Sequence, residues 1–235
     1  MKRIFFFLAG LLMLQAGLAQ KEVVVKKKDR KRDVLIQTSM GEMVVRLSDS
    51  TPLHRDNFLK LVKQKYYDGI LFHRVINNFM IQAGDPNSKN APAGQALGDG
   101  GPGYTVPAEF RPDLFHKKGV IAAARQGDQV NPLKASSGSQ FYITQGRKFS
   151  DAGLDSVETY RLNRKIPAEQ REVYKTLGGT PHLDQGYTVF GEVVSGLEVI
   201  DKIAAMPTSK AADRDRPLED VVISKMSLVK RKKRR

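Results

Sequence analysis

The chain has 235 residues, of which 40% are hydrophobic, contains neither cysteine nor tryptophan, and carries a formal net charge of +14. The length suits one large domain with a buried core, and the composition favours an ordinary soluble globular protein over a membrane or collagen-like one. The absence of cysteine also excludes disulfide scaffolds, thiol nucleophiles and cysteine-ligated metal sites.

Residues 1–19 have the pattern of a secretory signal peptide. Lys2 and Arg3 precede an uncharged apolar run over residues 4–14, and small residues follow over 16–19. The apolar run is shorter than the roughly 20 residues that a membrane-spanning helix needs. We therefore expect cleavage at the end of this stretch and a periplasmic or secreted location, with a retained membrane anchor as the alternative.

A basic linker is predicted over residues 20–33, and the folded domain over residues 34–229. Strand-forming residues over 34–38 and 43–47 flank Gly41, which can take a positive φ. This arrangement predicts a hairpin.

A helix is predicted over residues 52–64. Thr51 has the side chain of an N-cap, Pro52 suits the first helical position, and apolar residues then recur at helical spacing. The same periodicity predicts a second helix over residues 197–205.

Between these helices lie mostly short segments rich in strand-forming residues. Residues 70–76 and 79–83 predict a second hairpin around Asn77 and Asn78, which tolerate tight turns. Residues 84–107 are rich in glycine and proline and predict a long ordered loop. Further strands are predicted over residues 119–124, 140–144, 187–194 and 221–229. Many short strands and few helices favour an all-β sandwich or closed barrel.

The segment over about residues 151–180 departs from this pattern. Apolar residues lie among charged ones at helical spacing, Pro167 divides the stretch, and Gly178-Gly179 closes it. We expect one or two helices inserted between strands, either as a recognition element or as a length-tolerant surface insertion.

Most of the net charge lies at the two ends of the chain. The tail, residues 230–235, carries six positive charges and residues 21–33 carry a net four, so residues 34–229 are nearly neutral. Such blocks are typically solvated and attracted weakly to anionic surfaces. Because no aromatic residues are interleaved with the basic ones, we expect no specific nucleic-acid binding.

The usual catalytic constellations are missing from the sequence. The four histidines lack metal-ligand spacing, so no metal site is expected. The hydroxyls of residues 136–139 have no marked base or orienting acid, and the glycines near 98–103 lack the ending of a phosphate-binding loop. What remains is a binding module, or an enzyme whose reaction needs no nucleophile, metal or cofactor.

Three stretches then stand out, which read FHRVINNFMIQAGD over residues 72–85, SGSQFYI over residues 137–143 and VFGEV over residues 189–193. The first two resemble the signature stretches of the cyclophilins, in which Phe-His-Arg-Val-Ile leads to Phe-Met-x-Gln-Gly-Gly-Asp and Gly-Ser-Gln-Phe-Phe-Ile follows later. The third looks like that family's Val-Phe-Gly-x-Val strand. The resemblance runs in order from about residue 34 to 229, interrupted by the insert.

The resemblance implies an all-β fold, a closed eight-stranded antiparallel β-barrel capped by the two predicted helices and carrying the helical insert. It also implies a monomeric peptidyl-prolyl cis-trans isomerase that acts without a cofactor on proline-containing, unfolded or flexible exported polypeptides. The barrier to X-Pro rotation is about 18–20 kcal/mol and no bond is broken. A catalyst therefore needs an apolar slot for the proline ring, polar groups for the flanking backbone, and a donor to the prolyl nitrogen.

Arg74 is the catalytic residue that the resemblance implies, as the donor to the prolyl nitrogen, and its rigid guanidinium suits that task. The implied proline pocket consists of Phe79, Met80, Tyr142 and Leu183. The implied contacts to the substrate chain come from Gln82, Gln140 and the backbone at Ala124 and Arg125. Strand alternation places Phe79 on the face opposite to Met80 and Gln82, so Phe79 can join the pocket only if the chain bends near the Asn77-Asn78 turn.

Three further positions depart from the family pattern. His182 replaces a tryptophan that contacts cyclosporin in many members, so we expect weak binding of that drug. Tyr187 replaces a histidine of the pocket lining and keeps an aromatic wall with a polar tip. Arg125 replaces an asparagine, and we expect it to alter subsite preference more than activity.

Two alternatives to an isomerase stay open. One is a binding module or chaperone that keeps the proline groove and has little turnover, against which the intact Arg74 argues. The other is a basic anchor for nucleic acid or envelope polymers, whose function would lie in the charged ends.

Overall fold

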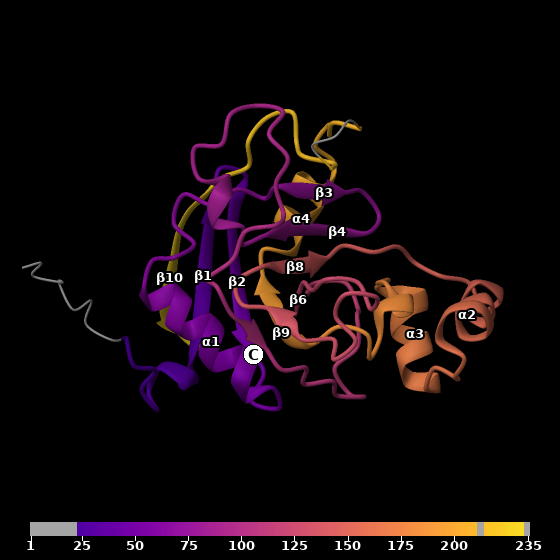
Figure 1. Ribbon diagram of the computed structural model, residues 1–235. Helices are drawn as coiled ribbons and strands as arrows, with labels where there is room; N and C mark the ends of the chain where they lie inside the picture. The colour runs from indigo at the N-terminus through magenta and orange to yellow at the C-terminus, as the bar shows by residue number, and fades with distance from the viewer. Residues whose placement is uncertain (1–22, 211–213, 233–235) are drawn as a thin grey trace, which may run out of the picture.

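The structure is a computed structural model that describes residues 23–210 and 214–232. Its main element is an antiparallel eight-stranded sheet in the order β10-β1-β2-β9-β6-β8-β4-β3 (Figure 1). The strands of this sheet are β1 (Arg32–Thr38), β2 (Gly41–Leu47), β3 (Arg74–Ile76), β4 (Met80–Ala83), β6 (Val120–Ala123), β8 (Phe141–Thr144), β9 (Val189–Ser195) and β10 (Ile223–Lys230). A separate pair consists of β5 (Thr105–Val106) and β7 (Ser136–Ser137). The predicted signal peptide lies outside the described residues.

The sheet curls into a half-barrel and does not close. Its edge strands, β3 and β10, share no ladder. The chain before each of them makes one isolated bridge, between Leu71 and Val222, and the Phe72 amide donates to the Val221 carbonyl at 2.9 Å. The predicted closed barrel is therefore wrong, because β3 is only three residues long and makes no ladder with β10. The contact to the start of β10 comes from residues 69–72, before β3, through a few backbone hydrogen bonds.

Alternation along the central strands separates two buried clusters. Ile121 and Ile143 belong to the main core, whereas their neighbours Ala122 and Tyr142 belong to a second cluster on the opposite face. Both faces of β6 and β8 are therefore buried. The second cluster lies where the candidate site is found.

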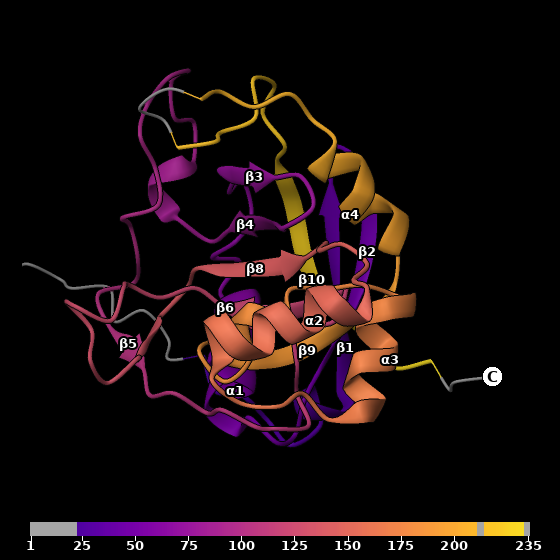
Figure 2. The ribbon, with the colours of Figure 1, turned by 90° about the vertical axis from the view of Figure 1, so that its right-hand side faces the viewer.

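Two helices cover the main core, as predicted, at opposite ends of the curled sheet (Figure 1, Figure 2). They are α1 (Pro52–Lys63) and α4 (Leu197–Ala204). Phe58 and Leu59 of α1 are buried in the core, and so are Ile200 and Ile203 of α4. Helical periodicity identified both because each helix buries one apolar face.

The start of α1 is capped by Glu109 and not by Thr51. The Thr51 side chain makes no capping hydrogen bond. The Glu109 carboxylate instead accepts from the backbone amides of Leu53 at 3.1 Å and His54 at 2.9 Å. Thr51 is thus at the predicted N-cap position, but its hydroxyl does not cap the helix, because a carboxylate from a distant loop accepts from the free amides of the first turn.

The insert is a helical hairpin that projects from the sheet, on the right in Figure 1. It contains α2 (Asp151–Val157), continued by the π-helical segment η3 (Glu158–Leu162), and α3 (Ala168–Thr176). Leu154 and Tyr174 are fully buried in a small core of its own. The prediction of one or two inserted helices is confirmed.

Both predicted hairpins form, with Gly41 at φ 134° and Asn78 at φ 60° in their turns. Within residues 84–107 the structure has only the 3-10 turn Pro86–Ser88 and the strand β5, as expected of a long loop. Among the described residues, no helix is long and apolar enough to cross a membrane.

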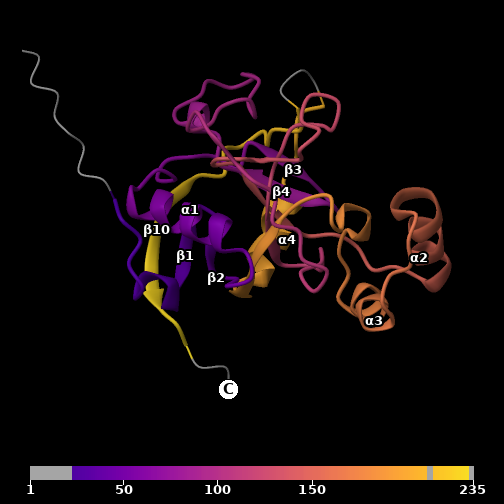
Figure 3. The same ribbon diagram turned by 60° about the horizontal axis from the view of Figure 1, so that its bottom comes forward.

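The two basic ends lie side by side. β1 begins at Arg32 and β10 ends at Lys230, so both strands extend into the segments that the sequence assigned to a linker and a tail. Arg32 and Lys230 are partners in the ladder, and Arg231 pairs with the buried Asp33 at 3.1 Å. The described parts of the two basic segments therefore meet at the β1–β10 pair of the sheet (Figure 3).

Candidate active site

A pocket of about 160 Å³ opens on the face of the sheet opposite to the main core. All nine of its lining residues are among those that the cyclophilin resemblance implied. They are Arg74, Phe79, Met80, Gln82, Ala124, Arg125, Tyr142, Leu183 and Tyr187. The structure thus brings together residues from four separate parts of the chain.

Strand pairing sets the centre of the pocket. Tyr142 of β8 lies between Gln82 of β4 and Ala122 of β6, and Gln82 is in turn the partner of Arg74 on β3. Side chains at paired positions project from the same face of a sheet. The register therefore aligns the guanidinium, the amide and the phenol ring in one row.

Phe79 joins this row because the chain bends before it. Asn78 is in the left-handed region, and the Phe79 carbonyl accepts from the amides of Gln145 and Gly146, both at 3.0 Å. Phe79 thereby packs against the cluster that contains Met80. The bend that the sequence required of the Asn77-Asn78 turn is present.

Arg74 is half-buried and only loosely held. Its guanidinium donates to Gln82 at 3.4 Å, a long hydrogen bond. The Gln82 amide donates to Gln140 at 3.0 Å, and the Gln140 amide donates to the carbonyls of Gly98 and Gly100, both at 2.8 Å. This row of amides contacts Arg74, and within residues 23–210 and 214–232 the other donors of the guanidinium make no hydrogen bond, so they can serve a ligand.

A larger pocket of about 810 Å³ adjoins the first and shares Gln82, Ala124 and Arg125 with it. Gln140 lines this second pocket, as do Val130 and Leu133, which are 73% and 86% exposed. We call the two pockets together the groove. The two adjoining pockets together can hold a peptide chain that continues beyond the residue in the smaller pocket.

The rim of the smaller pocket is a stacked pair, Arg125 and Tyr187. The Arg125 guanidinium lies 4.4 Å from the centre of the Tyr187 ring and donates to the Gly186 carbonyl at 2.7 Å. It also pairs with the exposed Asp128 at 2.6 Å. Arg125 thus holds the aromatic wall through its side chain.

The resemblance implied that the backbone at both Ala124 and Arg125 holds the substrate, and the structure differs at Ala124. The Ala124 amide donates to Gln140 at 3.0 Å, and the Ala124 carbonyl accepts from Ser137 at 2.8 Å. The Ala124 amide is therefore already occupied within the protein. The backbone amide and carbonyl of Arg125 make no hydrogen bond to the described part of the chain, so they are the groups that can hold a substrate.

His182 does not line the pocket but contacts a residue that does. Its ring stacks on Phe79 with the centres 5.7 Å apart, and the side chain is exposed. The neighbouring Leu183 does line the pocket. The structure therefore places His182 as a support of Phe79.

Two residues that the sequence analysis missed, His116 and Asp184, hold the pocket residue Tyr142 in place. The Tyr142 hydroxyl lies 2.9 Å from Nε2 of His116, and Nδ1 of His116 lies 3.0 Å from Asp184. His116 is fully buried and Asp184 is 6% exposed. Burial raises the pKa of Tyr142 well above its usual value of 10, so its phenol stays protonated. No local pattern marked this contact, because the residues are far apart in the sequence.

A second buried cluster corrects the prediction that the hydroxyls of residues 136–139 have no base or acid beside them. Nε2 of His54 lies 2.9 Å from the Ser136 hydroxyl, and Nδ1 lies 2.7 Å from Glu109, so a base and an orienting acid do stand beside the hydroxyls of 136–139. Burial lowers the pKa of His54 despite Glu109, which keeps the ring neutral. Ser136 is 1% exposed, however, so no substrate can reach it. We call these three residues the Ser136 cluster.

Metal chemistry has no evident basis in the described residues, where no three His, Asp or Glu side chains gather as a metal site. The groove offers hydrogen-bond donors, amides and aromatic walls. Such groups can bind and polarise a peptide without forming a covalent bond.

The family model "Cyclophilin type peptidyl-prolyl cis-trans isomerase/CLD" matches residues 33–228. The chain belongs to this family. The motifs that predicted it, including the one around Arg74, lie within the matched region.

Two relatives of this cyclophilin match most of its length, but they differ in how much of their own length it covers. A relative from Staphylococcus haemolyticus named for peptidyl-prolyl cis-trans isomerase is 34% identical over 205 residues, covering 86% of this chain and 93% of that protein. A relative from Streptococcus pyogenes named for both phosphatase and isomerase is 36% identical over 217 residues, covering 89% of this chain. The chain spans only 42% of the length of that second relative.

Solved structures share the fold. A cyclophilin-type isomerase from Cryptosporidium parvum matches with a TM-score of 0.60 and 23% identity, over 86% of this chain and 99% of that one. Another structure of that protein, determined in the presence of the dipeptide Ala-Pro, matches with a TM-score of 0.59.

Proposed function

We propose that this cyclophilin catalyses rotation about X-Pro bonds in unfolded or flexible exported polypeptides, with Arg74 as the catalytic residue. The observation that carries the proposal is a half-buried guanidinium in the lining of a small pocket whose walls also include Phe79, Met80 and Leu183. The Ala-Pro dipeptide used with the Cryptosporidium relative supports this class of substrate.

The groove residues suit the demands of this reaction. Phe79, Met80 and Leu183 offer an apolar surface to the ring, and the free backbone of Arg125 can hold the flanking peptide. As the amide twists, its nitrogen lone pair localises and becomes a better hydrogen-bond acceptor. Arg74 stabilises that state more than the planar ground state, which lowers the barrier.

The test compares wild type with Arg74→Ala in an isomerisation assay on a proline peptide. We expect kcat/KM to fall about 100- to 1,000-fold, the usual loss when a transition-state donor is removed. Arg161→Ala, at an exposed arginine of the insert, serves as the matched control and should leave the rate unchanged. Equal and slow rates in wild type and Arg74→Ala would instead support a proline-binding module or chaperone with little turnover.

We further propose export to the periplasm or the exterior, on the strength of the charged, apolar and small-residue pattern over residues 1–19. N-terminal sequencing of the protein recovered from the envelope fraction should find cleavage near Ala19. An intact N-terminus in the membrane fraction would support the retained anchor.

The paired basic ends support a weak attraction to anionic surfaces, where exported clients are found. Lys27, Lys28 and Lys31 are exposed close to the Arg32–Lys230 pair. Replacing these three lysines with glutamine should reduce retention on vesicles that contain phosphatidylglycerol, and 0.5 M salt should abolish retention of the wild type. The same retention in the triple variant would remove the basic surface from the proposal.

A further inference from the structure

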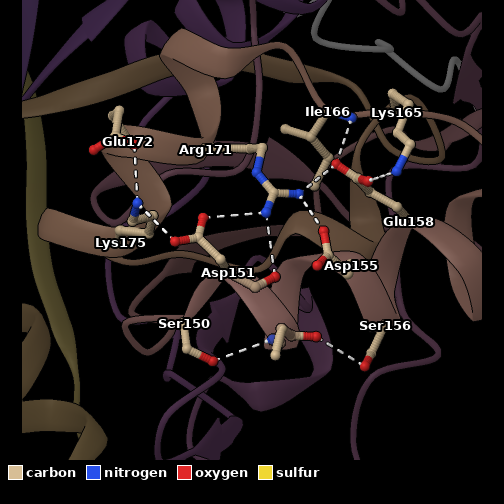
Figure 4. A network of polar contacts seen from close by, with 12 residues as sticks. Ser150, Asp151, Asp155, Ser156, Glu158, Lys165, Ile166, Arg171, Glu172 and Lys175 are labelled. Carbon is tan, nitrogen blue, oxygen red and sulfur yellow. Dashed lines mark hydrogen bonds and ion pairs between the residues drawn. The ribbon is translucent and has the colours of Figure 1, made fainter.

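The insert is a stiff unit whose two helices are held together by Arg171 (Figure 4). The guanidinium donates to Asp155 at 3.0 Å, to Glu158 at 2.7 Å and to Asp151 at 3.2 Å. Glu158 is only 3% exposed and also accepts from the Ile166 amide at 3.0 Å. Charged hydrogen bonds that converge in this way hold α2 against α3, so the hairpin can keep a side chain in a fixed place.

The insert returns to the sheet directly beside the pocket. Gly179 forms a backbone bridge with Lys117, and the Thr180 amide donates to the His116 carbonyl at 2.8 Å. A Cβ on Gly179 would collide with that carbonyl, so this close approach requires glycine. The next segment, Pro181–Leu183, ends in a pocket residue and packs against both α2 and η3.

One side chain of the insert reaches the pocket wall through buried polar groups. Tyr174 of α3 donates its hydroxyl to Asp184 at 2.8 Å. Asp184 contacts Nδ1 of His116, and Nε2 of His116 contacts the Tyr142 hydroxyl. All four residues are at most 6% exposed. We call them the Tyr174–Tyr142 relay.

The hydrogen bonds of the relay have a defined direction. The tautomer of His116 that satisfies both neighbours has Nδ1 donating to the Asp184 carboxylate and Nε2 accepting from the Tyr142 hydroxyl. Burial raises the pKa of both Tyr142 and Tyr174, so both phenols keep their protons. Each donor thus has one acceptor, and the orientation of the Tyr142 ring depends on the position of Asp184.

We propose that the insert sets the shape of the proline pocket through this relay, with Tyr174, Asp184 and His116 as positioning residues for isomerisation. The proposal rests on the isomerase function proposed above. The family stretch has phenylalanine where this chain has Tyr142, so the hydroxyl that completes the relay is a departure from that pattern. Because the relay ends in the pocket wall and not at Arg74, its loss should weaken binding of the proline ring more than it slows rotation.

The test is a double-mutant cycle with Tyr174→Phe and Tyr142→Phe, assayed on a proline peptide. We expect each single variant to raise KM about 3- to 10-fold with kcat within about twofold of wild type. The double variant should raise KM no more than the larger single effect, because both changes break the same chain. Tyr160→Phe is the matched control, since Tyr160 lies on the same insert and is 80% exposed; it should change neither parameter.

Two results would overturn the relay: an unchanged KM in Tyr174→Phe, or single effects that multiply in the double variant. If Tyr174→Phe does not fold, Asp184→Asn takes its place in the cycle with the same expected pattern. A wild type without isomerase activity would contradict the proposed function only. The cycle is then measured through the dissociation constant of the proline peptide, with the same expected non-additivity.

Discussion

The Ser136 cluster and the Tyr174–Tyr142 relay use the same chemistry in different surroundings. Each places a carboxylate on Nδ1 of a buried histidine and a hydroxyl on Nε2. The cluster ends at a serine that is 1% exposed and ties the start of α1 to β7, whereas the relay ends at a ring that lines the pocket. The comparison teaches that the surroundings of the hydroxyl residue decide the role of such a chain of hydrogen bonds. Where that residue is buried, the chain stabilises the fold, and where its side chain lines a pocket, the chain positions a site.

The largest expected effect is on the free energy of unfolding, and it distinguishes the Ser136 cluster from the Tyr174–Tyr142 relay. Glu109→Ala leaves the neutral His54 ring and the first two amides of α1 without their acceptor. Because an unpaired buried donor costs about 1–3 kcal/mol, we expect the free energy of unfolding to fall by about 3–5 kcal/mol in urea titrations. The activity of the molecules that remain folded should not change. Glu169→Ala, at an exposed carboxylate of the insert, should change stability by less than about 0.5 kcal/mol. A tenfold loss of kcat/KM in folded Glu109→Ala would instead connect the Ser136 cluster to the groove.

His73 extends the comparison, because it is a third buried histidine whose ring nitrogens have no hydrogen-bond partner in the described part of the chain. Burial lowers its pKa from 6.5 to about 4. The unfolded chain therefore binds a proton near pH 6.5 that the folded chain refuses until about pH 4. Stability should be highest above pH 6.5 and fall by about 3 kcal/mol as the pH is lowered toward 4.

Urea unfolding at a series of pH values checks this prediction, with His73→Asn as the comparison. The variant should show a shallower dependence on pH between 6.5 and 4, whatever its stability at neutral pH. Part of the slope should persist, because burial also lowers the pKa of His54. Identical slopes in both proteins would contradict the assignment to His73.

The smallest expected effect concerns the pocket wall formed by Tyr187, which the Arg125 side chain holds in place. Arg125→Ala removes the stacking on Tyr187 and the bond to Gly186, so we expect KM to rise about two- to fourfold with kcat unchanged. Arg125→Lys should fall between wild type and alanine, because an ammonium cannot stack. A rise of KM beyond tenfold would mean that the Arg125 side chain contacts the substrate itself.

Local patterns anticipated much of the fold and misjudged its long-range contacts. The two capping helices and both hairpins follow from periodicity and turn residues, and the structure contains them. Barrel closure was predicted wrongly, since β3 is too short for a ladder with β10. The N-cap position at Thr51 is confirmed, but its side chain does not cap the helix because Glu109 reaches α1 from another part of the chain. The two-residue strands β5 and β7 are too short for any periodic signal.

By itself the sequence determined the order of the elements, the family and the position of Arg74, because these depend on neighbouring residues and on contiguous motifs. Only the tertiary structure decided that Arg125 stacks on Tyr187, that His182 supports Phe79 from behind, and that the insert reaches the pocket. Hydrogen bonds between buried groups far apart in the chain depend on how the strands and the insert pack, and no local pattern records that packing.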